Sequence, residues 1–113
     1  MISDDTIEKI LDWRSKTAIA GPKARAERIY IEEYRKTLKA ILMKKAMAAT
    51  PGMSAVSAEM EAYAHPEYKM HLEALREAVE ADEKYRWLQV TADVKIECWR
   101  TQQANHRAME KGQ

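Results

Sequence analysis

The chain has few of the residues that interrupt helices or build phosphate-binding loops. Its 113 residues include three glycines and three prolines, and none of these lies between Glu67 and Glu110. Three widely spaced glycines exclude a Gly-rich phosphate loop and a dinucleotide-binding fingerprint. The chain also lacks a nucleophile elbow and a zinc-protease motif. We therefore expect a protein that is not an enzyme, with no catalytic residue and no cofactor.

Cysteine and long apolar runs are equally scarce. The single cysteine, Cys98, excludes a disulfide within the chain and fits a reducing cytosol. Its place on an apolar helix face favours a packing residue over a nucleophile. No run of about 18 apolar residues is present, so we expect no membrane span, and the acidic start Met1–Asp5 does not resemble a signal peptide. These features predict a cytoplasmic protein, in the host cytoplasm if a phage encodes it.

One group of residues suggests a metal site at first sight. His65, Glu67 and His71 lie close together in the sequence. Pro66 constrains the backbone between the first two, however, and no fourth ligand is apparent. We interpret His65 as a turn residue and His71 as a helix-surface residue, and expect no metal site.

The C-terminal part of the chain has the composition of one long helix. Pro66 suits a first helical turn because its φ is fixed and its missing N–H has no helical partner there. Good helix formers dominate the following residues, which predicts a helix over 66–111. At ~1.5 Å per residue it is roughly 65 Å long, more than a compact domain of this size needs. We expect it to pack along a second long helix or along copies of itself.

From Tyr85 onward, this helix carries two apolar stripes. The first stripe is Tyr85, Leu88, Ala92, Ile96 and Trp99, and the second stripe is Trp87, Thr91, Val94 and Cys98. A helix with two apolar faces needs a neighbouring helix on each face to bury it. A chain of this size has too few helices to cover both faces. We therefore predict oligomerisation through the long helix; the alternative is a monomeric bundle that buries both faces. The predicted oligomerisation residues are Tyr85, Trp87, Leu88, Val94, Ile96 and Trp99.

The N-terminal part of the chain predicts shorter helices. Ser3 or Asp4 is suited to cap the first, Gly21 to end it, and Pro22 to open a second helix over 22–49. The predicted buried stripe of this second helix is Tyr30, Tyr34, Leu38, Ile41 and Leu42, with Ile31 alongside.

A turn over 50–52 precedes a short helix, which Ser54 or Ser57 is suited to cap and which runs to about Tyr63. No stretch is typical of a β-strand. The sequence therefore predicts a single all-α domain over 1–113, with basic helices in 1–50. Its second helix is expected to run antiparallel to the long C-terminal helix over 66–111.

The formal net charge of +1 conceals an uneven distribution. Between Arg14 and Lys45 there are ten basic residues and three acidic ones, whereas residues 51–113 contain eight basic and eleven acidic residues. A locally basic segment in a nearly neutral chain indicates an anionic partner.

The basic residues of the second helix, together with its tyrosines, form a candidate nucleic-acid site. The candidate residues are Arg25, Arg28, Arg35, Lys36, Lys39, Lys44, Lys45, Tyr30 and Tyr34. Proteins that hold single strands typically place cations along the phosphates and aromatic rings against the bases. Each stacked base contributes ~1–3 kcal/mol of binding free energy. The alternative is a solubilising basic face, with both tyrosines in the core.

Two stretches resemble the UvsY-like recombination mediators of phages. Leu38–Leu42, before a Gly-containing turn, is similar to the family's Lys-Ala-Arg-Leu motif, which is linked to binding of single-stranded DNA. Lys39 takes the Lys position and Ile41 the Arg position, with Lys44 or Lys45 to supply the missing charge. Residues 85–98 and 107–109, with Gly112, resemble the family's C-terminal helix.

The resemblance implies a ring assembled through the C-terminal helix. Such a ring binds single-stranded DNA, helps to remove the single-strand-binding protein and loads a RecA-type recombinase. The main alternative is a structural helical assembly protein, such as a virion or scaffold component, that needs no nucleic acid. A monomeric helical enzyme or regulator lacks an active-site constellation in this sequence, and a helix-turn-helix reader of duplex DNA lacks the expected spacing.

Overall fold

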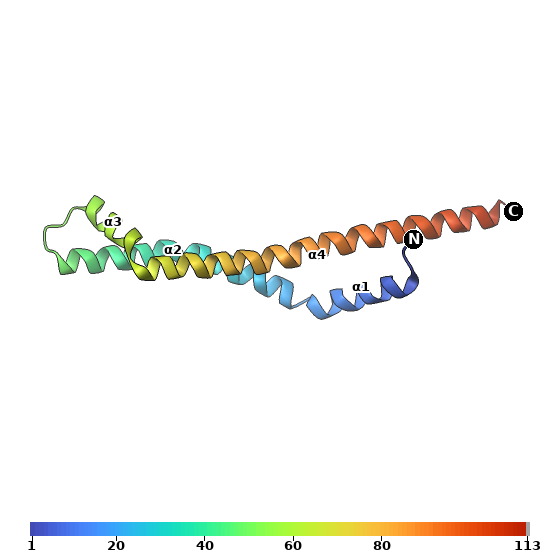
Figure 1. Cartoon of the computed structure of the whole chain (residues 1–113), viewed down its shortest axis with the longest axis horizontal. Coiled ribbons are helices and arrows are strands. Elements are labelled where there is room, and N and C mark those ends of the chain that lie inside the picture. The colour runs from blue at the N-terminus through green and yellow to red at the C-terminus, as the bar shows by residue number, and fades with distance from the viewer. Residues whose placement is uncertain (113) are drawn as a thin grey trace. The chain divides into compact units, whose positions relative to one another are not determined.

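The computed structural model describes residues 1–112, which form α-helices and no strand (Figure 1). The helices are α1 (Asp4–Thr17), α2 (Ala20–Ala49), α3 (Ala55–Ala64) and α4 (Pro66–Lys111). The all-α prediction and the long C-terminal helix are therefore confirmed. No helix in the described part of the chain is long and apolar enough to cross a membrane.

The chain splits into two compact units. The terminal unit contains Met1–Pro22 and the chain from Glu83 onward, and the central unit contains Lys23–Asp82. Each unit includes part of α4. The grouping of all residues into a single domain stays a prediction.

The start of α1 follows the sequence closely. The Ser3 hydroxyl accepts a hydrogen bond from the Thr6 N–H at 3.1 Å and caps the helix. Asp4 and Asp5 occupy the first turn, where carboxylates favour the positive end of the helix dipole. Of the two predicted caps, Ser3 is the observed one.

The break between α1 and α2 lies earlier than predicted. Helix α1 ends at Thr17 and α2 begins at Ala20, so Gly21 does not end the first helix and Pro22 is not the first residue of the second. Pro22 instead lies inside the first turn of α2. The first four N–H groups of a helix have no intrahelical partner, so the missing N–H of Pro22 removes no hydrogen bond there.

The turn before α3 agrees with the sequence. Gly52 has a φ of 86°, which a residue with a side chain adopts only with strain. The Ser54 hydroxyl then accepts a hydrogen bond from the Ser57 N–H at 3.1 Å and caps α3. His65 has an extended backbone at the end of α3, and Pro66 opens α4 directly after it, as predicted.

The core of the central unit lies where α2, α3 and α4 meet. Leu38 and Leu42 from α2 pack with Ala62 and Tyr68. Ala58 and Ala62 are almost fully buried, and their small side chains allow α3 to approach closely. Helix α2 runs antiparallel to this part of α4, as predicted.

Only part of the predicted α2 stripe is buried. Leu38 and Leu42 belong to the core, whereas Tyr30 is 65% exposed, Tyr34 37% and Ile41 40%. At about 100° per residue, Ile31, Leu38 and Leu42 fall within about 20° of one direction. Tyr30, Tyr34 and Ile41 lie about 60–100° away from it on one flank. The burial prediction was therefore wrong for these three side chains, because the buried face is narrower than the apolar pattern.

In the terminal unit, α1 packs antiparallel to its part of α4. Trp99 Nε1 donates a hydrogen bond to Asp4 Oδ1 at 2.9 Å, and the Ile2 N–H donates to Gln102 Oε1 at 3.1 Å. Farther along α1, Arg14 forms an ion pair with Asp93 at 3.2 Å. Ile7 of α1 and Ala92 of α4 are buried in this unit.

Leu42 provides a test of the central core. Its side chain is 2% exposed, so Leu42→Ala leaves a cavity and should lower the free energy of unfolding by about 2–5 kcal/mol. Urea unfolding followed by circular dichroism measures the change. The neighbouring variant Ile41→Ala should cost clearly less, because this side chain is 40% exposed. Equal losses for the two variants would contradict the described core.

Candidate nucleic-acid interface

The predicted cations of α2 fall into two groups, and the first is engaged across helices. Arg28 Nη1 lies 3.1 Å from Asp82 Oδ2 on α4. Lys39 Nζ lies 3.2 Å from Glu59 Oε1 on α3, and the Nζ of Lys45 lies 3.9 Å from a Glu67 carboxylate oxygen on α4. These three charges help to hold the helices together.

The second group of cations is exposed. Arg25, Arg35 and Lys44 are exposed and, within residues 1–112, take part in no described hydrogen bond or ion pair. Lys36 contacts only Glu33, at 3.7 Å, and both of these side chains are more than 70% exposed. Exposed pairs of this kind contribute little free energy, so these four cations are available to an anion.

The central unit as a whole has no net charge. It contains ten Lys or Arg residues and ten Asp or Glu residues, because α3 and α4 bring acidic residues to basic α2. Eight of the ten basic residues between Arg14 and Lys45 lie in this unit, where acidic residues balance them. Attraction of an anion depends on local placement of charge rather than on a long-range field.

Helical geometry separates most of the predicted cations from the predicted tyrosines. Relative to the buried face of α2, the basic flank lies about 40–140° to one side. This flank consists of Arg25, Arg28, Arg35, Lys36 and Lys39. The tyrosine flank, with Tyr30 and Tyr34, lies about 60–100° to the other side. Lys44 and Lys45 lie on the tyrosine side, about 140° and 40° from the buried face. The structure therefore separates five of the seven predicted cations from the two predicted tyrosines.

The tyrosine flank carries its own aromatic cluster. The rings of Tyr30 and Tyr34 are stacked, with centroids 6.1 Å apart and planes at 15°. The His71 ring lies 5.7 Å from that of Tyr34. Nε2 of His71 is 2.8 Å from the Ile31 carbonyl oxygen, which ties α4 to α2.

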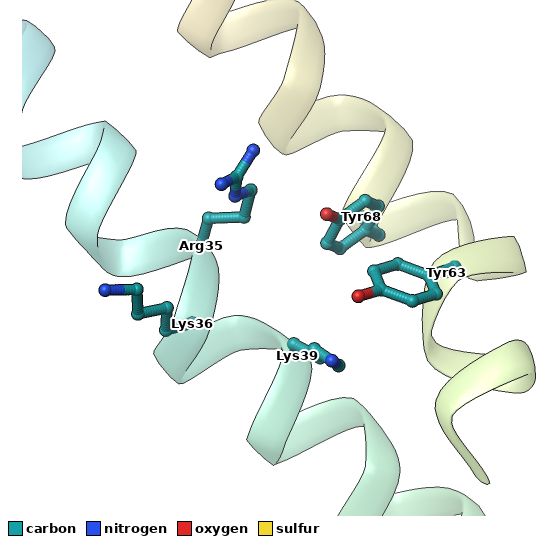
Figure 2. Close-up of a pocket in the computed structure, with 5 residues that line it drawn as sticks. All are labelled: Arg35, Lys36, Lys39, Tyr63 and Tyr68. Atoms are coloured by element: carbon teal, nitrogen blue, oxygen red, sulfur yellow. The ribbon is translucent and has the colours of Figure 1, made fainter. Parts of the chain in front are cut away.

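Two other tyrosines meet the basic flank. Tyr63 of α3 and Tyr68 of α4 line a groove of about 290 Å³ with Arg35, Lys36 and Lys39. The two rings lie edge to face, with centroids 5.2 Å apart. Figure 2 shows their phenol oxygens directed toward α2, with Lys39 extending toward Tyr63 and Lys36 pointing away from both rings.

Sequence reasoning missed Tyr63 and Tyr68. They are separated by more than twenty residues from Lys39, so no local pattern on α2 includes them. The sequence could have predicted that these two tyrosines lie near each other, because they flank His65-Pro66 and a turn between two helices brings the flanking side chains together. The antiparallel return of α4 then places both rings beside α2.

The charge of Lys39 is supported by its neighbours. A hydrogen bond with the Tyr63 phenol and, next in size, one with the Glu59 carboxylate raise the pKa of Lys39 above the usual lysine value. Its Nζ also lies 4.9 Å from the centre of the Tyr63 ring. Lys39 therefore stays protonated throughout the neutral range, and its position is fixed by contacts with α3.

Of the residues considered for a metal site, His65 has a local contact and His71 a contact between helices. His65 Nδ1 accepts a hydrogen bond from the Glu67 N–H at 3.1 Å at the start of α4, while His71 contacts α2. Within residues 1–112, no group of three or more His, Cys, Asp or Glu residues is arranged to hold a metal ion.

The predicted oligomerisation residues lie on two different faces of α4. Ala92 of the first stripe is buried, and Tyr85, Ile96 and Trp99 are half-buried on the face that packs against α1. Leu88, at the edge of this face, is 42% exposed.

The second stripe has no cover within the described residues. Trp87 is 62% exposed and Val94 57%, and Thr91 and Cys98 are exposed as well. These residues lie about 100–160° around α4 from Ala92. Exposed Thr101, Asn105 and Ala108 continue the stripe at alternating steps of three and four, the spacing of a coiled-coil seam.

Comparison with known proteins gives no family for this chain. No family model, curated protein or solved structure matches it significantly. Its function is therefore inferred from the residues and geometry described above.

Proposed function

We propose that the chain binds single-stranded DNA along the basic flank of α2. The observation that carries this proposal is the groove in which Arg35, Lys36 and Lys39 meet Tyr63 and Tyr68. Exposed cations contact phosphates, and Tyr63, which is 47% exposed, offers an aromatic surface to a base. Such combinations are typical of proteins that hold single strands without a sequence preference.

The proposal includes self-association through the second stripe of α4. Trp87 and Val94 are large apolar side chains on a regular, exposed seam, and burial of such side chains contributes ~1.5–3 kcal/mol each. An oligomer presents several copies of the basic flank to one strand. Weak contacts then combine through multivalency without any strong single site.

The biological role that we propose is that of a recombination mediator. In this role, the oligomer binds single-stranded DNA, helps to remove the single-strand-binding protein and helps to load a RecA-type recombinase. These two protein partners and the ring form of the oligomer enter the proposal through the resemblance to UvsY-like mediators alone. The residues themselves support the binding and assembly steps.

A structural assembly protein is the second candidate function. The exposed second stripe favours assembly whether or not nucleic acid binds, and the central unit has no net charge. A virion or scaffold component that needs no DNA shares these features. A flat fluorescence-anisotropy titration of a labelled oligonucleotide, with an oligomer present, would favour this function.

Removal of two exposed cations tests DNA binding. Arg35→Ala combined with Lys36→Ala should weaken binding of labelled oligo(dT) by about tenfold or more in fluorescence anisotropy. The slope of log affinity against log salt concentration should fall by about 0.7 for each lost phosphate contact. Arg76→Ala, which removes one exposed cation of α4, should change affinity much less. Unchanged affinity in the double variant, or equal affinity for duplex DNA, would contradict the proposed site.

The two tyrosine sets are distinguished by single variants. Tyr63→Ala should weaken oligonucleotide binding by the value of one stacked ring, ~1–3 kcal/mol, because this ring lies beside the basic flank. Tyr30→Ala should have a smaller effect, because Tyr30 lies on the opposite flank. If Tyr30→Ala weakened binding more than Tyr63→Ala in the same anisotropy titration, strand binding would be assigned to the tyrosine flank instead.

A charge placed in the second stripe tests self-association. Val94→Glu should lower the mass in solution, measured by light scattering at matched concentrations, because burial of an unpaired carboxylate is costly. Met60→Glu introduces the same charge at a 68% exposed position of α3 and should leave the mass unchanged. A wild-type chain that stays monomeric at all practical concentrations would rule out the proposed assembly.

A further inference from the structure

The groove between α2 and the tyrosines is bounded by carboxylates along the helix. On the Lys39 side, Glu59 lies 3.2 Å from Nζ of that lysine. On the opposite side, Glu32 and Asp82 lie 3.0 and 3.1 Å from the guanidinium of Arg28. Glu32 is less than one helical turn from Arg35. The positive region is therefore short, with negative charge at both of its ends along α2.

Hydrogen-bond donors of three helices line this short region. Arg35 and Lys39 come from α2, the Tyr63 phenol from α3 and the Tyr68 phenol from α4 (Figure 2). Lys36 lies at the rim. A guanidinium, an ammonium and two hydroxyl groups are all donors to anionic oxygens, and charge-assisted hydrogen bonds to phosphate are the strong ones.

The boundaries favour a phosphate at the end of a strand. An internal phosphodiester carries one negative charge and has a phosphate neighbour on each side. If such a strand lies along α2, it meets Glu59 in one direction and Glu32 and Asp82 in the other. A terminal phosphate monoester carries ≈ −1.5 to −2 charge at neutral pH and has a neighbour on one side only. It suits a short row of donors better and avoids one of the two acidic boundaries.

We propose that this groove is a site for the terminal phosphate of a DNA strand, with Arg35, Lys39 and the phenols of Tyr63 and Tyr68 as its donors. This inference rests on the proposed binding of single-stranded DNA and adds a preference for phosphorylated ends. The groove volume of about 290 Å³ lies near the lower limit of small-molecule sites. It therefore suits one terminal group rather than several nucleotides.

The test compares one labelled oligo(dT) in three forms: 5′-phosphorylated, 3′-phosphorylated and without a terminal phosphate. The full-length chain should bind at least one phosphorylated form about tenfold more tightly than the unphosphorylated form, as expected for added charge-assisted hydrogen bonds. Arg35→Gln and Tyr63→Phe should each reduce this preference. Both are side-chain changes at the groove surface, and circular dichroism checks that the helices are retained.

Lys44→Ala serves as the matched control, because Lys44 is an exposed cation of α2 outside the groove. It should lower the affinity for all three oligonucleotides by the same factor and preserve the preference for phosphorylated ends. Loss of the preference in this variant would show that the preference follows total charge, which overturns the groove assignment.

The outcomes separate this inference from the proposed function. Equal affinity for all three oligonucleotides would overturn the terminal-phosphate site and leave single-strand binding intact. Binding of thymidine 5′-monophosphate in calorimetry, weakened by Arg35→Gln, would support the phosphate site even if no oligonucleotide bound. If neither the mononucleotide nor any oligonucleotide bound, both proposals would fail.

Discussion

The structure depends on one constraint: α4 is a single uninterrupted helix that needs apolar cover along its length. No Gly or Pro lies between Glu67 and Glu110, so the chain cannot fold back within this region. In the central unit, α2 and α3 cover the beginning of α4. In the terminal unit, α1 covers one face of the remainder. The second stripe follows directly from this arrangement, because one short helix covers only one side of its partner.

The same constraint determines the electrostatics of the central unit. Since α4 returns antiparallel to α2, its acidic residues lie beside the basic residues of α2, as Asp82 does with Arg28 and Glu67 with Lys45. A basic segment in the sequence thereby becomes part of a neutral folded unit. What remains for an anionic partner is a local feature: Arg25, Arg35 and Lys36 lie on the basic flank without a described ion pair to another helix.

Local signals in the sequence predicted the helices well. The Ser3 cap, the turn at Gly52 and the His65-Pro66 junction each depend on the chemistry of one or two residues, which is readable without tertiary structure. The exception was Gly21-Pro22. Glycine and proline are compatible with the first turn of a helix as well as with a break, so their presence alone did not locate the boundary.

The candidate site was less predictable, for a geometric reason. The spacing of cations and tyrosines on α2 identified an exposed basic helix, but apolar spacing alone did not fix which direction was buried. A shift of one residue turns a side chain by about 100°, enough to place Tyr30 and Tyr34 on the flank opposite Arg35 and Lys39. Tyr63 and Tyr68 were beyond the reach of local patterns, because only the packing of α3 and α4 brings them to α2.

In the proposed function, the neutrality of the central unit links assembly to binding. A strongly basic protein attracts a strand over the Debye length of ≈ 8 Å in physiological salt, and one copy has appreciable affinity. This chain has a net charge of only +1, and only four of the predicted cations of α2 are exposed without an ion pair to another helix. In the proposed function, one copy therefore gains only short-range contacts. If those contacts hold a strand, several copies must act on it together. The apolar second stripe of α4, on a surface that α1 leaves uncovered, is the surface that we propose holds such copies in one assembly.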